Sequence, residues 1–164
     1  APLKSSLIMV TNSAHEYDYL GARRLIDSGV LPKPDRVAAW LHLGASISVV
    51  GYRRRDDGGM ERLLTGPQAG VQGLPEFEAH ARTAFATAPL MRYRLTGGGL
   101  GELGNIVGHG YRGVGLIGGH PSFPFGHTRL DGVASIDPRQ LSTIGAGVAR
   151  LLRLVDQDAN TSPA

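Results

Sequence analysis

The sequence contains no cysteine, only two lysines, and few aromatic residues, which make up 6% of the chain. The lack of cysteine excludes a disulfide framework and thiolate chemistry. No stretch approaches the roughly 20 apolar residues of a membrane span, so no membrane partner is expected. The net charge is only +3, and the run Arg53–Arg55 is followed at once by two aspartates. The basic residues therefore do not indicate a nucleic-acid partner.

The composition that remains is typical of a folded domain. Apolar residues make up 41% and charged residues 19% of the 164 positions, which is too apolar and too weakly charged for a disordered chain. A chain of this length can bury a hydrophobic core of its own. We expect a single domain over residues 1–156, followed by a polar tail over residues 157–164.

Strand-like and helix-like segments alternate along the sequence. Continuous apolar runs between turn residues predict buried strands, and apolar residues at helical spacing predict helices. The expected strands cover residues 7–10, 37–43, 46–52, 90–95 and 113–117, and the expected helices cover residues 17–28, 75–88 and 138–155. Asp137 is the expected N-cap of the last helix, and Pro138 its first residue. This alternation predicts an α/β fold with a mixed, mainly parallel sheet flanked by helices.

Two polar segments follow expected strands and are candidates for a functional site. Residues 13–19 (SAHEYDY) follow the first strand, and residues 118–131, with two histidines and an aspartate, follow the last. Open α/β sheets place their sites at the carboxyl ends of strands. The alternatives are that Glu16 and Asp18 only complement the dipole of the following helix, and that the second segment is a surface loop anchored by aromatic residues.

A third segment, residues 97–110, is rich in glycine and contains Glu102 and His109. It lacks the Gly-Lys-Ser/Thr of a phosphate-binding loop and the spacing of a dinucleotide fingerprint. The glycines instead suggest that the backbone passes close to a site or to neighbouring strands.

Taken in order, these segments resemble the later half of the zinc aminopeptidases, the co-catalytic di-zinc exopeptidases related to the single-zinc glutaminyl cyclases. The resemblance rests on an apolar strand leading to His15-Glu16 and Gly21, on Glu102 some eight positions before Gly110 and the strand at 113–117, and on the ending. That ending, His127-Thr128-Arg129-Leu130-Asp131 and then Ile136-Asp137-Pro138 before the last helix, is its most specific part.

The resemblance implies roles for individual residues. Glu16 and His127 correspond to metal ligands, and His15 and Glu102 to acidic positions of the active site that would handle protons. Phe123, Phe125 and His120 belong to the loop that would line the substrate pocket. The implied cofactor is zinc, as one ion or none, and the implied substrate is a peptide or amide.

The sequence also departs from this family. His15 stands where the family has a carboxylate base, and Gly44 stands where it has a ligand aspartate. His42 shares a strand face with Gly44, so it either replaces that ligand or is a buried structural histidine. We expect an upstream segment or a partner chain to complete the fold. The alternative function is a non-catalytic, zinc-free descendant that acts as a binding or assembly module.

Overall fold

The computed structural model describes residues 2–63, 69–88, 91–99, 101–118 and 123–159. Its centre is a sheet of four strands in the order β1-β6-β4-β5. These are β1 (Trp40–Leu43), β4 (Gly70–Gly73), β5 (Arg92–Arg94) and β6 (Gly113–Ile117). β1 runs parallel to β6 and β4 parallel to β5, whereas β4 and β6 are antiparallel. The predicted α/β class, with a mixed and mainly parallel sheet, is therefore confirmed.

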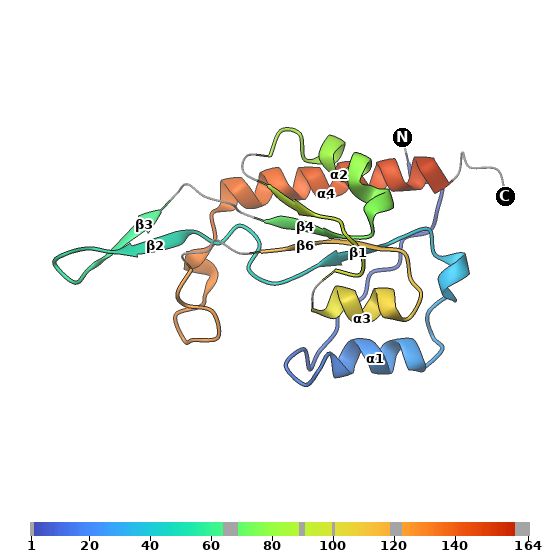
Figure 1. Cartoon of the computed structure of the whole chain (residues 1–164), viewed down its shortest axis with the longest axis horizontal. Helices are drawn as coiled ribbons and strands as arrows, with labels where there is room; N and C mark the ends of the chain where they lie inside the picture. Colours follow the sequence, from blue (N-terminus) through green and yellow to red (C-terminus); the bar gives the residue numbers. More distant parts are fainter. Residues whose placement is uncertain (1, 64–68, 89–90, 100, 119–122, 160–164) are drawn as a thin grey trace.

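Helices cover both faces of this sheet (Figure 1). The helices α2 (Glu78–Ala84) and α4 (Pro138–Ala159) lie on one face, and α1 (Leu20–Asp27) and α3 (Glu102–Gly108) lie on the other. A separate hairpin of β2 (Gly51–Arg54) and β3 (Met60–Leu63) extends from one end of the molecule. Short 3₁₀ turns occupy Pro34–Arg36, Pro75–Phe77 and Val133–Ser135.

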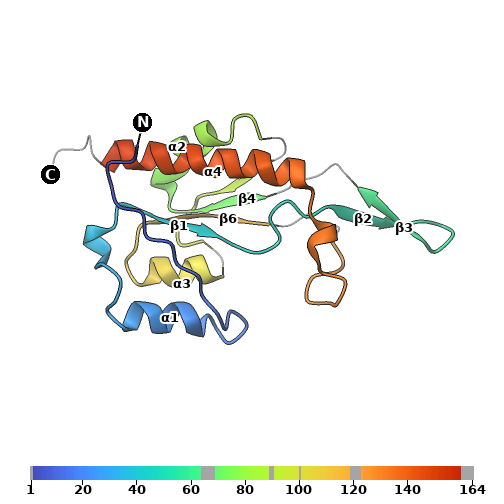
Figure 2. The same ribbon diagram turned by 180° about the vertical axis from the view of Figure 1, so that it is seen from behind.

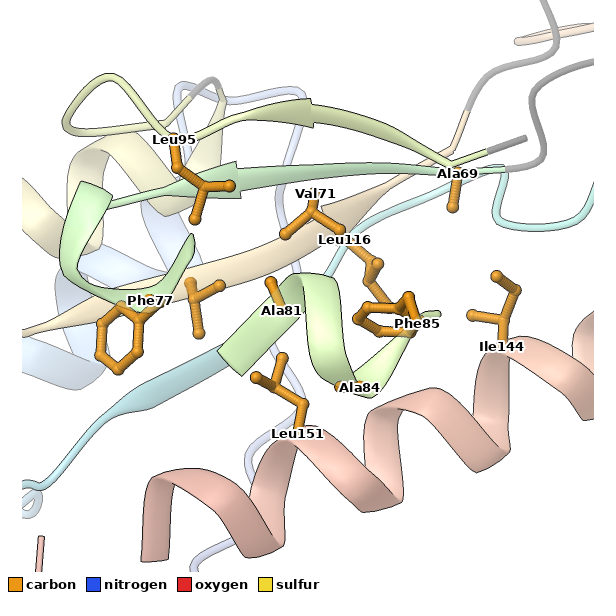
Figure 3. Close-up of a cluster of buried hydrophobic side chains, with 11 residues drawn as sticks. Ala69, Val71, Phe77, Ala81, Ala84, Phe85, Leu95, Leu116, Ile144 and Leu151 are labelled. Atoms are coloured by element: carbon orange, nitrogen blue, oxygen red, sulfur yellow. The ribbon is translucent and has the colours of Figure 1, made fainter. Parts of the chain in front are cut away.

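The hydrophobic core lies between the sheet and the α2–α4 layer (Figure 3). Phe85, Ile144 and Leu151 are at most 2% exposed, and they pack with Val114 and Leu116 of β6. A side chain at Gly147 of α4 would collide with the ring of Phe85, so the close approach of the two helices requires glycine there.

The start of α4 agrees with its predicted cap. The Asp137 carboxylate accepts the backbone N–H of Arg139 at 2.9 Å and that of Gln140 at 3.3 Å. These bonds satisfy two N–H groups that the first turn of a helix leaves unpaired. The helix runs to Ala159, which places its apolar stripe along the sheet.

The prediction of a buried strand at residues 7–10 is wrong. These residues are irregular, and Leu7, Ile8 and Met9 are 56%, 56% and 87% exposed. Within the described part of the chain, residues 6–13 make no backbone hydrogen bond, so no neighbouring strand pairs with this segment. Together with α1 and the residues after it, the segment borders an uncharged groove of about 430 Å³. The expectation that another polypeptide segment completes this side stays a prediction.

The N-terminal segment contacts the C-terminal end of α4 before it crosses to α1 (Figure 2). The Asp156 carboxylate accepts the backbone N–H of Lys4 at 2.9 Å and that of Ser5 at 2.8 Å. The bond from Lys4 contributes most to lowering the pKa of Asp156, with further contributions from Ser5 and from the charge of Lys4.

This tether predicts a pH-dependent contribution to stability. A carboxyl whose pKa is lowered in the folded state stabilises the fold above its unfolded pKa of about 3.9. The contribution is lost as the pH falls through the folded pKa. We expect Asp156→Asn to be less stable than the wild type at pH 7, and the gap to close in acid. Urea unfolding between pH 2 and 7 measures this difference in the free energy of unfolding. Asp56→Asn, at an exposed position, is the control. A gap independent of pH would contradict the assignment.

Candidate functional site

The candidate site lies on the α1–α3 side of the sheet, where β6 carries glycine at positions 113 and 115. Val114 and Leu116 face the core on the other side, so the alternating Gly113 and Gly115 face α3. A Cβ at Gly113 would lie 2.9 Å from Leu103 of α3. One at Gly115 would lie 2.8 Å from the Cβ of His42. These glycines therefore make room both for α3 and for His42.

Glu102 is the centre of this site. It is the first residue of α3 and is only 8% exposed. Its Oε2 lies 4.0 Å from His42 Nε2 and 4.0 Å from His15 Nδ1. Its Oε1 accepts a hydrogen bond from the Asn12 amide at 3.5 Å. A buried carboxylate needs partners of this kind, because burial without them opposes its charge.

His15 occupies the solvent-facing side of Glu102. Its side chain is 55% exposed, and its ring packs edge-on against Tyr19, with 4.9 Å between ring centres. The turn that carries it is strained, because Ala14, Asp18 and Tyr19 all have φ between 54° and 57°. Backbone strain of this type clusters at functional sites.

A second pair lies beside the first. His127 Nε2 is 3.5 Å from Glu16 Oε1, and both side chains are well exposed, at 83% and 69%. Because Glu16 follows His15 directly, the two pairs are neighbours along the backbone. The structure thus brings together Glu16 with His127 and His15 with Glu102.

The aromatic residues of the last loop contact the hairpin. The Phe125 ring packs against Tyr52 of β2 with 4.8 Å between ring centres, and the Phe123 ring packs against Phe125 at 5.8 Å. These contacts anchor the loop that carries His127. A role of the two phenylalanines in a substrate pocket stays a prediction. His120 lies outside the described residues.

His42 is the site residue whose role the sequence left open. Its side chain is 12% exposed and faces Glu102. Burial lowers the pKa of His42; the Glu102 charge opposes this effect, and His15 adds to it. His42 is therefore uncharged near neutral pH, with one ring nitrogen protonated. Asn12 is a second contact that the sequence did not indicate, because it depends on how residues 6–13 cross the sheet.

The Glu16–His127 pair fits part of a zinc site. Two donors of one tetrahedral zinc ion lie roughly 3.3–3.5 Å apart, and imidazole with carboxylate is a donor set that zinc accepts. Their separation of 3.5 Å matches this spacing. Among the described residues, however, no group of three His, Asp or Glu side chains is arranged to hold a metal ion. A third donor would have to come from elsewhere.

No family model, curated protein or solved structure matches the chain. The likeness to zinc exopeptidases therefore stays a prediction, and the function has to be argued from the geometry. In the described part of the chain, no helix has both the length and the apolar character needed to cross a membrane.

Proposed function

We propose that this chain is a metallo-aminopeptidase-like hydrolase that cleaves a peptide or amide bond with an activated water. In this proposal, Glu16 and His127 hold a zinc ion, and His15 and Glu102 handle protons. Zinc bound in this way would polarise the carbonyl and make water a better nucleophile.

One observation supports the proposal most. The sequence predicts all four residues, and they lie in three distant parts of the chain. In the structure they form two pairs, with 4.0 Å between His15 Nδ1 and Glu102 Oε2 and 3.5 Å between Glu16 Oε1 and His127 Nε2.

The geometry of His15 suits a general base. Its Nδ1 faces the carboxylate, which leaves Nε2 for a proton taken from water. Once the 4.0 Å between Nδ1 and Oε2 shortens to a hydrogen bond in a substrate complex, the carboxylate would hold the imidazole in one tautomer and stabilise the imidazolium that forms. Histidine is the side chain that most often serves as a general base.

A second candidate function is a non-catalytic binding or assembly module. The observation that favours it is the incomplete donor set, because Glu16 and His127 are exposed and no third donor joins them within the described residues. In that case the Glu16–His127 contact is only an exposed ion pair, which contributes little to stability.

Zinc binding and hydrolysis separate the two functions. We expect about one zinc per chain by calorimetric titration, and zinc-dependent release of p-nitroaniline from aminoacyl p-nitroanilides. Loss of a group that only orients a metal ligand lowers metal affinity by about 10–100-fold, and loss of the ligand itself lowers it further. Glu16→Gln and His127→Ala should therefore each weaken zinc affinity by at least that factor.

The matched control is His109→Ala, at the opposite end of α3 from Glu102. It should leave zinc affinity unchanged. If the wild type binds no zinc and releases no p-nitroaniline, the hydrolase is rejected in favour of the binding module. Zinc bound equally well by Glu16→Gln would reject the ligand assignment.

A further inference from the structure

The Glu102 carboxylate has a nearly buried side as well as a solvent-facing side. His15 faces Oε2 from solvent, whereas His42 faces the same oxygen from β1, with 4.0 Å to each imidazole nitrogen. Asn12 donates to the other oxygen. We propose that His42 is a positioning residue, which donates its Nε2–H to Glu102 Oε2 and thereby fixes the carboxylate that orients His15.

This inference rests on the proposed role of the His15–Glu102 pair. It goes further by adding a third residue, so that a series of contacts runs from solvent through His15 and Glu102 to His42. The separations of 4.0 Å are longer than a hydrogen bond. Hydrogen bonds of catalytic groups are often long without substrate and shorten in the complex.

The strand holds His42 firmly enough to position another group. His42 pairs with Gly115 in the parallel β1–β6 register, and its backbone and Cβ fill the space that a side chain at Gly115 would need. The ring is also largely enclosed, because the His42 side chain is only 12% exposed. A side chain fixed by packing in this way loses little entropy when it forms a hydrogen bond.

The charges of the site agree with a neutral donor at His42. The titratable groups that face His42 are Glu102 of α3 and His15 of the turn before α1. Burial lowers the pKa of His42, so the ring carries one proton and no charge near neutral pH. A neutral donor leaves the Glu102 charge free to stabilise the imidazolium that forms when His15 accepts a proton.

Two substitutions of His42 distinguish a positioning role from a packing role. Glutamine keeps an N–H donor at the position of Nε2, and leucine keeps the apolar bulk without a donor. We expect His42→Leu to lower kcat by about 10–100-fold with little change in KM, as for other residues that orient a site group. His42→Gln should retain most of the activity. Equal losses in both variants would overturn the proposal.

A double substitution tests whether His42 acts through Glu102. If it does, His42→Leu should cost little more in a Glu102→Gln background, because the group that it positions is already lost. Multiplicative losses would indicate an independent role and would overturn the proposal. Thermal unfolding of each variant checks that the fold is retained.

An NMR measurement on the zinc-free chain keeps the inference separate from the proposed function. Imidazole ¹⁵N spectra should show His42 protonated at Nε2, and this resonance should shift in Glu102→Gln whereas those of His109 do not. Protonation at Nδ1 instead, or an unchanged His42 resonance, would overturn the contact. If the wild type does not hydrolyse amides, only the proposed function fails, and these spectra still decide the His42–Glu102 contact.

Discussion

Leu151→Ala is expected to lower the free energy of unfolding by about 2–5 kcal/mol. Leu151 is 1% exposed and belongs to the cluster that joins α4 to α2 and the sheet. Truncation removes buried apolar area and leaves a cavity that the close-packed helices cannot fill, because Phe85 already fits against the glycine at position 147. Urea unfolding followed by circular dichroism gives the value.

Leu130→Ala is the matched control, because it removes the same atoms from a side chain that is 67% exposed. We expect a change within about 0.5 kcal/mol, as for other surface substitutions. Similar losses in the two variants would show that α4 does not pack on the sheet in solution as it does in the structure. The pair therefore tests the main core of the fold directly.

The elements that could be predicted are those in which several local sequence features indicate the same structure. The strand at residues 113–117 and the helix that begins at Pro138 were predicted with these starting points, and both are confirmed. In the helix, a cap, a proline at the first position and a long apolar stripe all indicate one structure. Such agreement between local features is what makes a prediction from sequence reliable.

Residues 7–10 show why an apolar run alone is not enough. The run has the composition of a buried strand, but a strand forms only where another strand supplies hydrogen-bond partners. Among the described residues none does so, and the segment stays irregular and exposed. Burial depends on the rest of the fold, which four residues do not encode.

The helix α3 was missed for the opposite reason. The glycine-rich residues 97–110 indicate only close passage of the backbone, and Gly97, Gly98, Gly99 and Gly101 do have positive φ. They end at a helix of only seven residues, which is too short for apolar periodicity to stand out. Leu103 and Ile106 are nevertheless fully buried. This short helix places Glu102 in the site.

The roles expected of Glu16, His127, His15 and Glu102 come from the order of residue types along the sequence, and these roles stay predictions. The structure places the four residues in two pairs, Glu16 with His127 and His15 with Glu102. The contact of His42 with Glu102 depends on the register of β1 against β6 and on two glycines that leave space. Neither the register nor the space can be derived from the residues next to His42 in sequence.

His15→Gln is expected to lower kcat for a p-nitroanilide by about 10²–10⁴-fold, the usual contribution of a general base. Glutamine keeps a polar group of similar reach beside Glu102, but its amide does not take up a proton near neutral pH. KM should change little, because the proton is transferred only in the transition state.

His109→Gln supplies the comparison for this experiment. His109 is exposed, and its Nδ1 lies 2.8 Å from the Asn105 carbonyl oxygen at the end of α3 away from the site. Its substitution should leave kcat within about twofold, because a group distant from the reacting atoms contributes no differential binding of the transition state. If His15→Gln also left kcat unchanged, His15 would not be the base. Glu102, the other group that was expected to handle protons, would then be the residue to test.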